Sequence, residues 1–214
     1  MTSTLTPHRA PPVSVLGSAG ALGLVASGGV VLGAGTAFAQ AVLPRAASPL
    51  ANSAGSWVLA AFLLALSCRR LSAAAAGGAL ALAALTCGYY VTNELRGYPA
   101  STAHVLFWLV ASVAVGPFLG AAAHVLRTAA PRLAALGAGG LAGLLIGEGV
   151  YGLRFLDGDT AAYWWVQIAV ATVVWATALR HLRVRGRLPA ADANLALAVV
   201  VTLAVAFPVI YSRI

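Results

Sequence analysis

Apolar runs of roughly 20 residues recur along this chain of 214 residues, and they decide which structures it can adopt. A run of about that length lets an α-helix cross the hydrocarbon core of a bilayer. Charged residues make up only 8% of the chain, against about 25% in soluble domains, while 61% of its residues are hydrophobic. Because backbone polar groups must be paired inside a bilayer, the sequence predicts an all-α, polytopic membrane helix bundle.

Seven transmembrane helices are expected, and together they form one domain over residues 13–211. Their predicted ranges are residues 13–39, 52–68, 71–93, 102–126, 133–153, 161–179 and 193–211. A polar, proline-rich tail of residues 1–12 precedes them and is expected to be disordered. The first run ends in Ala37-Phe38-Ala39, which resembles a signal-peptidase site, but its length favours a retained helix. The short loops predict antiparallel neighbours.

The basic residues, all of them arginine, determine the expected orientation. The chain has no lysine, which excludes a retinal Schiff base and therefore a rhodopsin. Nine arginines lie on the side of the N-terminus and four on the other side, the first set being Arg9, Arg69, Arg70, Arg127, Arg132, Arg180, Arg183, Arg185 and Arg187. This asymmetry predicts a plasma-membrane protein with a cytoplasmic N-terminus and an outside C-terminus. Membrane-surface electrostatics explain the net charge of +8, so the lipid bilayer rather than nucleic acid is the expected partner.

One carboxyl group, that of Glu148, lies inside the apolar stretch of residues 141–159. An ionisable group at such depth costs about 2.5 kcal/mol or more and marks a functional site by default. Counted from the cytoplasmic end, Glu148 lies roughly 22 Å into a core about 30 Å thick, in its outer third. Tyr151 and Phe155 follow on the same helical face. The alternative is a packing role in which Glu148 pairs with Arg96 or Arg154.

Other polar and aromatic residues also gather at the outer helix ends. We therefore predict an outward pocket whose candidate ligand-binding residues are Trp57, Tyr89, Tyr90, Asn93, Glu94, His104, Trp108, Glu148, Tyr151 and Trp164. An aromatic belt at the membrane interface is the competing explanation for the tryptophans and tyrosines. Glu94 and His104 have a similar alternative, as a solvated helix end and an interfacial residue.

Three further features concern packing and the loops. Glycines recur every four residues at Gly139, Gly143 and Gly147, and again at Gly29 and Gly33. Such stripes let helix backbones approach closely, either within the bundle or against a partner helix. The pair at residues 116–117 is a candidate break in the fourth helix. The loop of residues 40–53 is a candidate lid over the pocket.

Motifs for common cofactors are missing from the sequence. His, Cys, Asp and Glu show no metal-site spacing, and neither a Walker loop nor a Rossmann glycine fingerprint occurs, so we expect no cofactor and no metal. Cys68 and Cys87 are too far apart along the chain's helices for an expected disulfide. Asp157 and Asp159 are expected to be solvated loop residues, since two carboxylates alone do not make a divalent-cation site.

Several segments carry a resemblance to a known family. They are ANSAGSWVLAAFLLA at 51–65, GYY at 88–90, LRG at 95–97, GPFLGAAAH at 116–124 and GEGVY at 147–151. As a set they resemble a group of actinobacterial multi-pass membrane proteins classed as a domain of unknown function, over most of residues 25–180. The resemblance implies membrane location and no settled activity. The architecture is also similar, more loosely, to substrate-binding subunits of energy-coupling-factor transporters, which have a loop over an outward pocket and small residues on helix one that meet a partner.

Three functions remain open at this point. The first is small-molecule recognition or transport, with Glu148 pairing with a cationic or hydrogen-bonding group of the ligand and aromatic faces adding further contacts. Because no ATP motif occurs, a membrane or ATPase partner subunit would supply energy. The second is an intramembrane cyclase or lyase that acts on a lipophilic, isoprenoid-like substrate with Glu148 as general acid. The third is a structural or accessory membrane protein, and whether the chain is an enzyme stays undecided.

Overall fold

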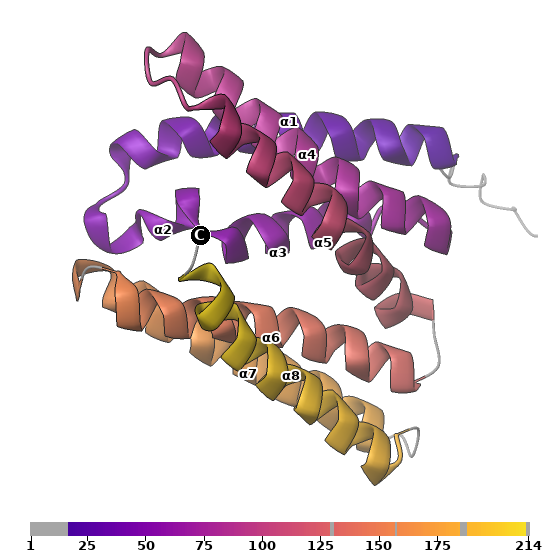
Figure 1. Ribbon diagram of the computed structural model, residues 1–214. Helices are drawn as coiled ribbons and strands as arrows, with labels where there is room; N and C mark the ends of the chain where they lie inside the picture. Colours follow the sequence, from indigo (N-terminus) through magenta and orange to yellow (C-terminus); the bar gives the residue numbers. More distant parts are fainter. Residues whose placement is uncertain (1–16, 129–130, 157, 185–187, 213–214) are drawn as a thin grey trace, which may run out of the picture.

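The computed structural model describes residues 17–128, 131–156, 158–184 and 188–212, and within these ranges the fold is all-α, as predicted (Figure 1). The predicted disordered tail, together with Asp157, Arg185 and Arg187, lies outside the described residues. The elements are α1 (Ser18–Val42), η1 (Arg45–Ala47), α2 (Pro49–Asn52), α3 (Ala54–Ala65), α4 (Leu71–Leu95), α5 (Thr102–Thr128), α6 (Pro131–Phe155), η2 (Gly158–Thr160), α7 (Ala161–Val184) and α8 (Ala190–Tyr211).

Six of the described helices are long and apolar enough to cross a membrane, namely α1 and α4 to α8. The segment predicted as the second spanning helix differs from a regular span. Residues Arg45–Asn52 and Ala54–Ala65 form a pair of helical segments bent by 47°, and they add a seventh span if the pair is counted as one. At about 1.5 Å per residue, the 12 residues of α3 reach only about 18 Å, so α3 alone is shorter than the hydrocarbon core.

Small residues hold the helices in two groups, α1 with α4 and α5, and α6 with α7 and α8, while α3 lies between them (Figure 1). A methyl group added at Gly33 would overlap the backbone of Leu85 in α4. At Gly143 it would lie 2.9 Å from the Cα of Val200 in α8. Both predicted glycine stripes are therefore used for packing within the chain, and neither is available to a partner helix.

The candidate break in the fourth spanning helix is wrong, because α5 runs without interruption from Thr102 to Thr128 with Pro117 inside it. Proline removes one backbone hydrogen bond from a helix. Here the neighbouring glycines support the helix from one side, since Gly116 and Gly120 lie against the backbone of α4 at Ala79 and Ala74. Packing against a neighbouring helix lets a membrane helix continue through a proline.

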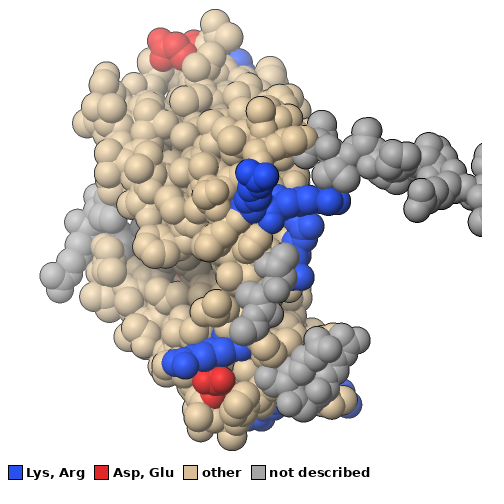
Figure 2. Space-filling view, turned by 90° about the vertical axis from the view of Figure 1, so that its right-hand side faces the viewer, with Lys and Arg blue, Asp and Glu red and all other residues tan. Residues whose placement is uncertain are grey.

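Exposed arginines gather at one end of the bundle. Figure 2 shows this end, which contains the start of α1, the link from α3 to α4 and the link from α7 to α8. Its described, exposed arginines are Arg69, Arg70, Arg127, Arg132, Arg180 and Arg183. Arg132 lies 3.4 Å from the carboxylate of Asp192. The opposite end is formed by the end of α1, the end of α4 and the start of α5, and it holds the site described next.

Candidate functional site

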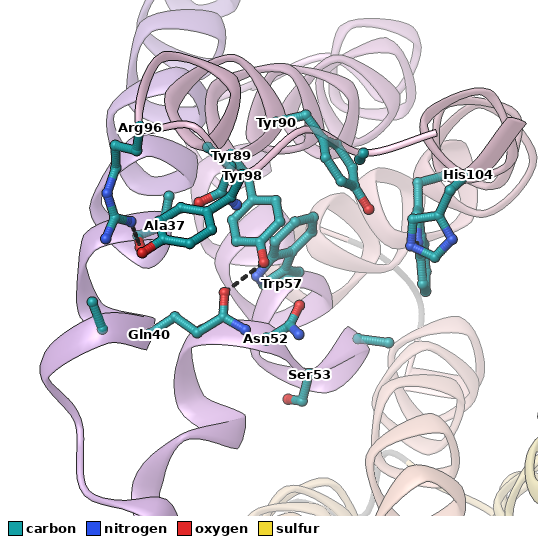
Figure 3. Close-up of a pocket in the computed structure, with 15 residues that line it drawn as sticks. Ala37, Gln40, Asn52, Ser53, Trp57, Tyr89, Tyr90, Arg96, Tyr98 and His104 are labelled. Carbon is teal, nitrogen blue, oxygen red and sulfur yellow. Dashed lines mark hydrogen bonds between the residues drawn. The ribbon is translucent and has the colours of Figure 1, made fainter. Parts of the chain in front are cut away.

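A cavity of about 620 Å³, here called the outer cavity and drawn in Figure 3, lies at the bundle end opposite the six exposed arginines named above. It is enclosed by the end of α1, the α2–α3 junction, the end of α4 and the start of α5. Its lining residues are Ala37, Gln40, Ala41, Asn52, Ser53, Ala54, Trp57, Tyr89, Tyr90, Asn93, Arg96, Tyr98, Ala100, His104 and Trp108. Its volume is within the range of about 300–1,000 Å³ that is usual for small-molecule sites.

Aromatic rings form a continuous wall of the outer cavity. The ring of Tyr89 meets those of Trp57 and Tyr90 edge-on, with centroids 5.2 and 5.1 Å apart. Tyr90 continues the chain to His104 at 6.0 Å, and His104 to Trp108 at 6.3 Å. Edge-to-face rings at such distances attract each other beyond their simple burial. The wall is therefore rigid enough to present flat apolar surfaces to a ligand.

Hydrogen bonds fix the ends of this wall. The hydroxyl of Tyr89 donates to Gln40 Oε1 at 2.6 Å, which ties α4 to the last turn of α1 (Figure 3). The indole N–H of Trp57 donates to the carbonyl of Ala51 at 3.2 Å. The indole N–H of Trp108 donates to Nε2 of His104 at 3.2 Å, so the other ring nitrogen of a neutral His104 carries the proton.

A tight turn at the end of α4 brings two more side chains over the outer cavity. Gly97 has a φ of 81°, and the N–H groups of Gly97 and Tyr98 donate to the carbonyls of Glu94 and Asn93 at 3.0 and 2.8 Å. These paired bonds are the Schellman arrangement, which needs a left-handed residue that glycine adopts without strain. The turn places the guanidinium of Arg96 over the ring of Tyr98, 5.5 Å from its centroid.

The outer cavity is electropositive, and its lining includes a side-chain amide that is not used in a hydrogen bond within the described structure. Arg96 is the one formally charged side chain among its lining residues, and no carboxylate lines it. The guanidinium also donates to the carbonyl of Ala37 and lies 4.8 Å from the centroid of the Phe38 ring. Asn93 is only 9% exposed, yet its side-chain amide makes no hydrogen bond within the described part of the chain. Because Asn93 lines the outer cavity, its amide is open to that space and can offer a donor and an acceptor to a ligand.

Glu148 lies outside the outer cavity. It is 4% exposed and lines neither this cavity nor the second one described below. Its Oε2 accepts hydrogen bonds from the backbone N–H of Gly55 at 2.7 Å and from Nε2 of Gln167 at 3.0 Å. Its partners are thus not Arg96 or Arg154, the two that the alternative packing role named, and the glutamate instead joins α6 to α3 and α7.

The bend between α2 and α3 explains why Glu148 is needed there. A helix that begins inside the protein leaves N–H groups of its first turn without partners. The Oγ of Ser53 accepts from the N–H of Ser56 at 3.2 Å, and Glu148 supplies the acceptor for Gly55. A side chain at Gly55 would overlap Glu148 Oε2, so glycine permits this approach. The hydroxyl of Tyr163 completes the cluster 3.1 Å from Ser53 Oγ.

The structure brings six of the ten predicted binding residues to the outer cavity: Trp57, Tyr89, Tyr90, Asn93, His104 and Trp108. The other four, Glu94, Glu148, Tyr151 and Trp164, do not line it. Glu94 is exposed at the end of α4. Trp164 is 2% exposed and donates its indole N–H to Thr160 Oγ1 at 2.9 Å. The ring of Tyr151 lies 5.2 Å from that of Phe155.

Sequence reasoning missed several lining residues, chiefly Gln40, Asn52, Arg96 and Tyr98. Two signals pointed toward them. The predicted lid contains Gln40 and Asn52, and the Leu-Arg-Gly sequence at 95–97 contains the glycine of the turn. The lid loop itself is packed: η1 contacts η2, where Arg45 lies 3.4 Å from Asp159, and Pro49 is buried.

A second cavity of about 280 Å³, here called the inner cavity, adjoins the outer one. Ala54, Trp57 and Trp108 line both. Its remaining lining residues are Val58, Leu82, Thr86, Phe107, Ala111, Ser112, Val115, Leu144, Leu203, Ala206, Phe207 and Ile210. This set is apolar apart from two hydroxyl side chains. Among the described residues, no group of three or more His, Cys, Asp or Glu side chains is placed to hold a metal ion.

Comparison with known proteins gives one match. The model of a family described as "Family of unknown function (DUF6518)" matches residues 13–214. No curated protein and no solved structure matches the chain.

Proposed function

The chain belongs to the DUF6518 family of unknown function, and from this premise we propose that it recognises or transports a small molecule through the outer cavity. The observation that supports this most directly is an aromatic cavity of about 620 Å³ whose lining includes the side-chain amide of Asn93, which makes no hydrogen bond to another described residue. Apolar walls with a few placed polar groups are typical of ligand sites.

We further propose that the protein lies in the plasma membrane with its N-terminus in the cytoplasm and its C-terminus outside. The arginines at the bundle end in Figure 2 support this orientation, because cytoplasmic loops carry an excess of basic residues. Seven spans follow if the bent α2–α3 pair is counted as one. In this orientation the outer cavity opens to the extracytoplasmic side.

The proposed ligand carries an anionic or hydrogen-bond-accepting group rather than a cation. Arg96 is the formally charged lining residue, and Glu148 is turned away into the α3–α6–α7 junction. A guanidinium next to free amide donors favours planar or tetrahedral anions such as carboxylates and phosphates. Tyr90 and Trp108 would stack against the less polar part of the same molecule.

Intramembrane acid catalysis has less support, because a general acid must come within hydrogen-bond reach of its substrate. Glu148 lines neither cavity. The likeness to substrate-binding subunits of energy-coupling-factor transporters is also weakened, since Gly29 and Gly33 on α1 pack against α4. If the chain acts in transport, the arginine-rich end is the surface that a membrane or ATPase partner subunit would contact.

Native mass spectrometry of the protein gently extracted from its own host tests the proposal. Wild-type protein is expected to carry a small molecule, and Asn93→Leu is expected to lose it, because leucine keeps the branched shape of asparagine, is somewhat larger and lacks the amide. The backbone carbonyl of residue 93 still accepts from Tyr98, so the turn at the end of α4 is retained.

Glu94→Gln is the matched control, since Glu94 is adjacent in sequence but exposed and outside the cavity lining. It should retain the bound mass. A wild-type protein that carries no small molecule, or a mass that Asn93→Leu retains in full, would overturn the proposal and favour a structural or accessory role.

A further inference from the structure

We propose that the ligand of the outer cavity is a single-chain amphiphile whose anionic head group binds beside Arg96 and Asn93 and whose hydrocarbon chain occupies the inner cavity. This inference rests on the proposed function, and it adds the chemical class of the ligand. It is carried by the junction of the two cavities, by the change in polarity between them and by the position of the inner cavity between α5 and α8.

The two cavities meet at a shared wall. Trp57 of α3 and Trp108 of α5 line both of them, and so does Ala54 at the start of α3. A ligand that stacks against these indoles from the outer side is therefore next to the inner cavity. A molecule longer than the outer cavity would extend past the two tryptophans and into it.

The polarity of the lining changes abruptly at this wall. On the outer side lie Arg96, Asn93 and Asn52, with amide and guanidinium groups. On the inner side the polar residues are Thr86 and Ser112, and the hydroxyl of Ser112 is already used, because it donates to the carbonyl of Trp108 at 2.7 Å. A space lined by hydrocarbon offers a hydrocarbon chain favourable burial and offers a polar group none.

The flanks of the inner cavity face the bilayer. Its walls include Ala111 of α5 and Ala206 of α8, two helices that do not pack closely against each other in the described structure. The outward faces of the same helices are apolar and exposed, with Val113 67% and Val205 62% exposed. In a membrane these faces contact lipid chains, so an alkyl chain can reach the inner cavity without crossing water.

The test uses dodecyl phosphate with a photoactivatable diazirine in the middle of its chain, added to the full-length protein in phosphatidylcholine nanodiscs. After illumination, peptide mapping locates the labelled residues. We expect labels on the inner-cavity segments of α5 and α8, at residues 111–115 and 203–207, and competition by unlabelled dodecyl phosphate.

Ala111→Phe fills the inner cavity and should reduce this labelling about tenfold, as expected when a bulky ring is forced into a ligand's space. Ala114→Phe is the matched control, because Ala114 is three residues further along α5 but exposed and outside the lining, and it should change the labelling less than twofold. Ala206→Phe tests the same cavity from α8, which keeps the test valid if one variant fails to fold.

The outcomes separate this inference from the proposed function. Labelling that is lost in Asn93→Leu but unaffected by Ala111→Phe and Ala206→Phe would overturn the placement of the hydrocarbon chain in the inner cavity. It would leave the proposed binding at the outer cavity intact. Labelling that is spread over the lipid-exposed faces of all helices, and is unaffected by Asn93→Leu, would show that single-chain anionic amphiphiles bind neither cavity. It would overturn the inference and, for this class of ligand, the proposed function. Loss of labelling in both filled variants, with the Ala114→Phe control intact, supports the proposal.

Discussion

Glu148 illustrates how one residue can be conspicuous in sequence and yet have a structural use. Its oxygen accepts from the N–H of Gly55 in α3 and from the amide of Gln167 in α7, so three helices meet at one carboxyl group. The N-terminal end of a helix carries a partial positive charge and free donors, which makes a carboxyl group a favourable neighbour there. We interpret Glu148 as a helix cap supplied from a distant part of the chain.

Replacing Glu148 separates this capping role from an acid role. Glu148→Ala leaves the buried N–H of Gly55 without an acceptor, and we expect it to destabilise the protein by about 1–3 kcal/mol. Glu148→Gln keeps an acceptor oxygen at the same position, so its cost should be clearly smaller. Thermal unfolding midpoints in detergent, followed by tryptophan fluorescence, measure both.

Glu94→Ala is the control for this pair, because Glu94 is exposed. Equal destabilisation by Glu148→Ala and Glu148→Gln would contradict the capping interpretation. Normal stability of Glu148→Gln together with complete loss of a measured activity would instead revive the general acid.

The sequence could identify Glu148 as unusual but could not identify its partners. Depth in an apolar run is visible from spacing alone, whereas the contact between Gly55 and Glu148 joins residues 93 positions apart. Charge alone points to an arginine as the partner of a buried carboxyl group, whereas the actual partners are a backbone N–H and a side-chain amide. Backbone donors at a helix bend cannot be recognised until the bend itself is known.

At the level of helices, close packing by small residues positions the aromatic wall. Gly33 of α1 lies against the backbone of α4 at Leu85 and Tyr89. The next residues of α4 form the outer cavity, and Tyr89 donates back to Gln40 on α1. The spacing between α1 and α4 therefore sets the distance across which the Tyr89–Gln40 hydrogen bond forms.

Gly33→Ala is expected to push these two helices apart. The added methyl group would overlap backbone atoms that cannot rotate away, and overpacking of this kind costs about 1–3 kcal/mol. The unfolding midpoint should fall, and binding at the outer cavity should weaken with it. Gly35→Ala is the control on the same helix, because nothing lies within 4 Å of a methyl group placed there. A Gly33→Ala variant as stable as Gly35→Ala would contradict the packing argument.

Helix positions were predictable to within a few residues for most of the spans, since long apolar runs determine them. The second span was the exception. The pattern over residues 52–68 predicts one regular helix, but the chain bends after α2, Ser53 caps a new helix at Ala54, and α3 ends at Ala65. The continuity of α5 through Pro117 was missed for a related reason, because both outcomes depend on contacts with neighbouring helices.

For the whole molecule, the distribution of arginines makes the orientation testable. In a background with Cys68 and Cys87 replaced by alanine, a single cysteine is introduced at either Pro99 or Arg183, both of which are exposed. We expect a membrane-impermeant maleimide to label the Pro99→Cys variant in intact cells. The Arg183→Cys variant should react only after the membrane is permeabilised, because it lies at the arginine-rich end. The reverse pattern would contradict the proposed topology.

For the molecule as a whole, the sequence predicted an all-α membrane helix bundle. It also predicted membership of a family without a settled activity, and the family that matches is one of unknown function. It could not predict that the short α3 would lie between two groups of helices or that two cavities would meet at Trp57 and Trp108. These features arise from how helices far apart in sequence are placed side by side, which no local pattern specifies.

The cap on α3 also has a consequence for how the chain is made. A ribosome synthesises α3 long before α6, and 93 residues separate Gly55 from the carboxyl group that accepts its hydrogen bond. Until α6 has entered the bilayer, the start of α3 lacks its acceptor and α3 is too short to span the membrane by itself. We therefore expect α3 to reach its final position only after α6 has been inserted beside it.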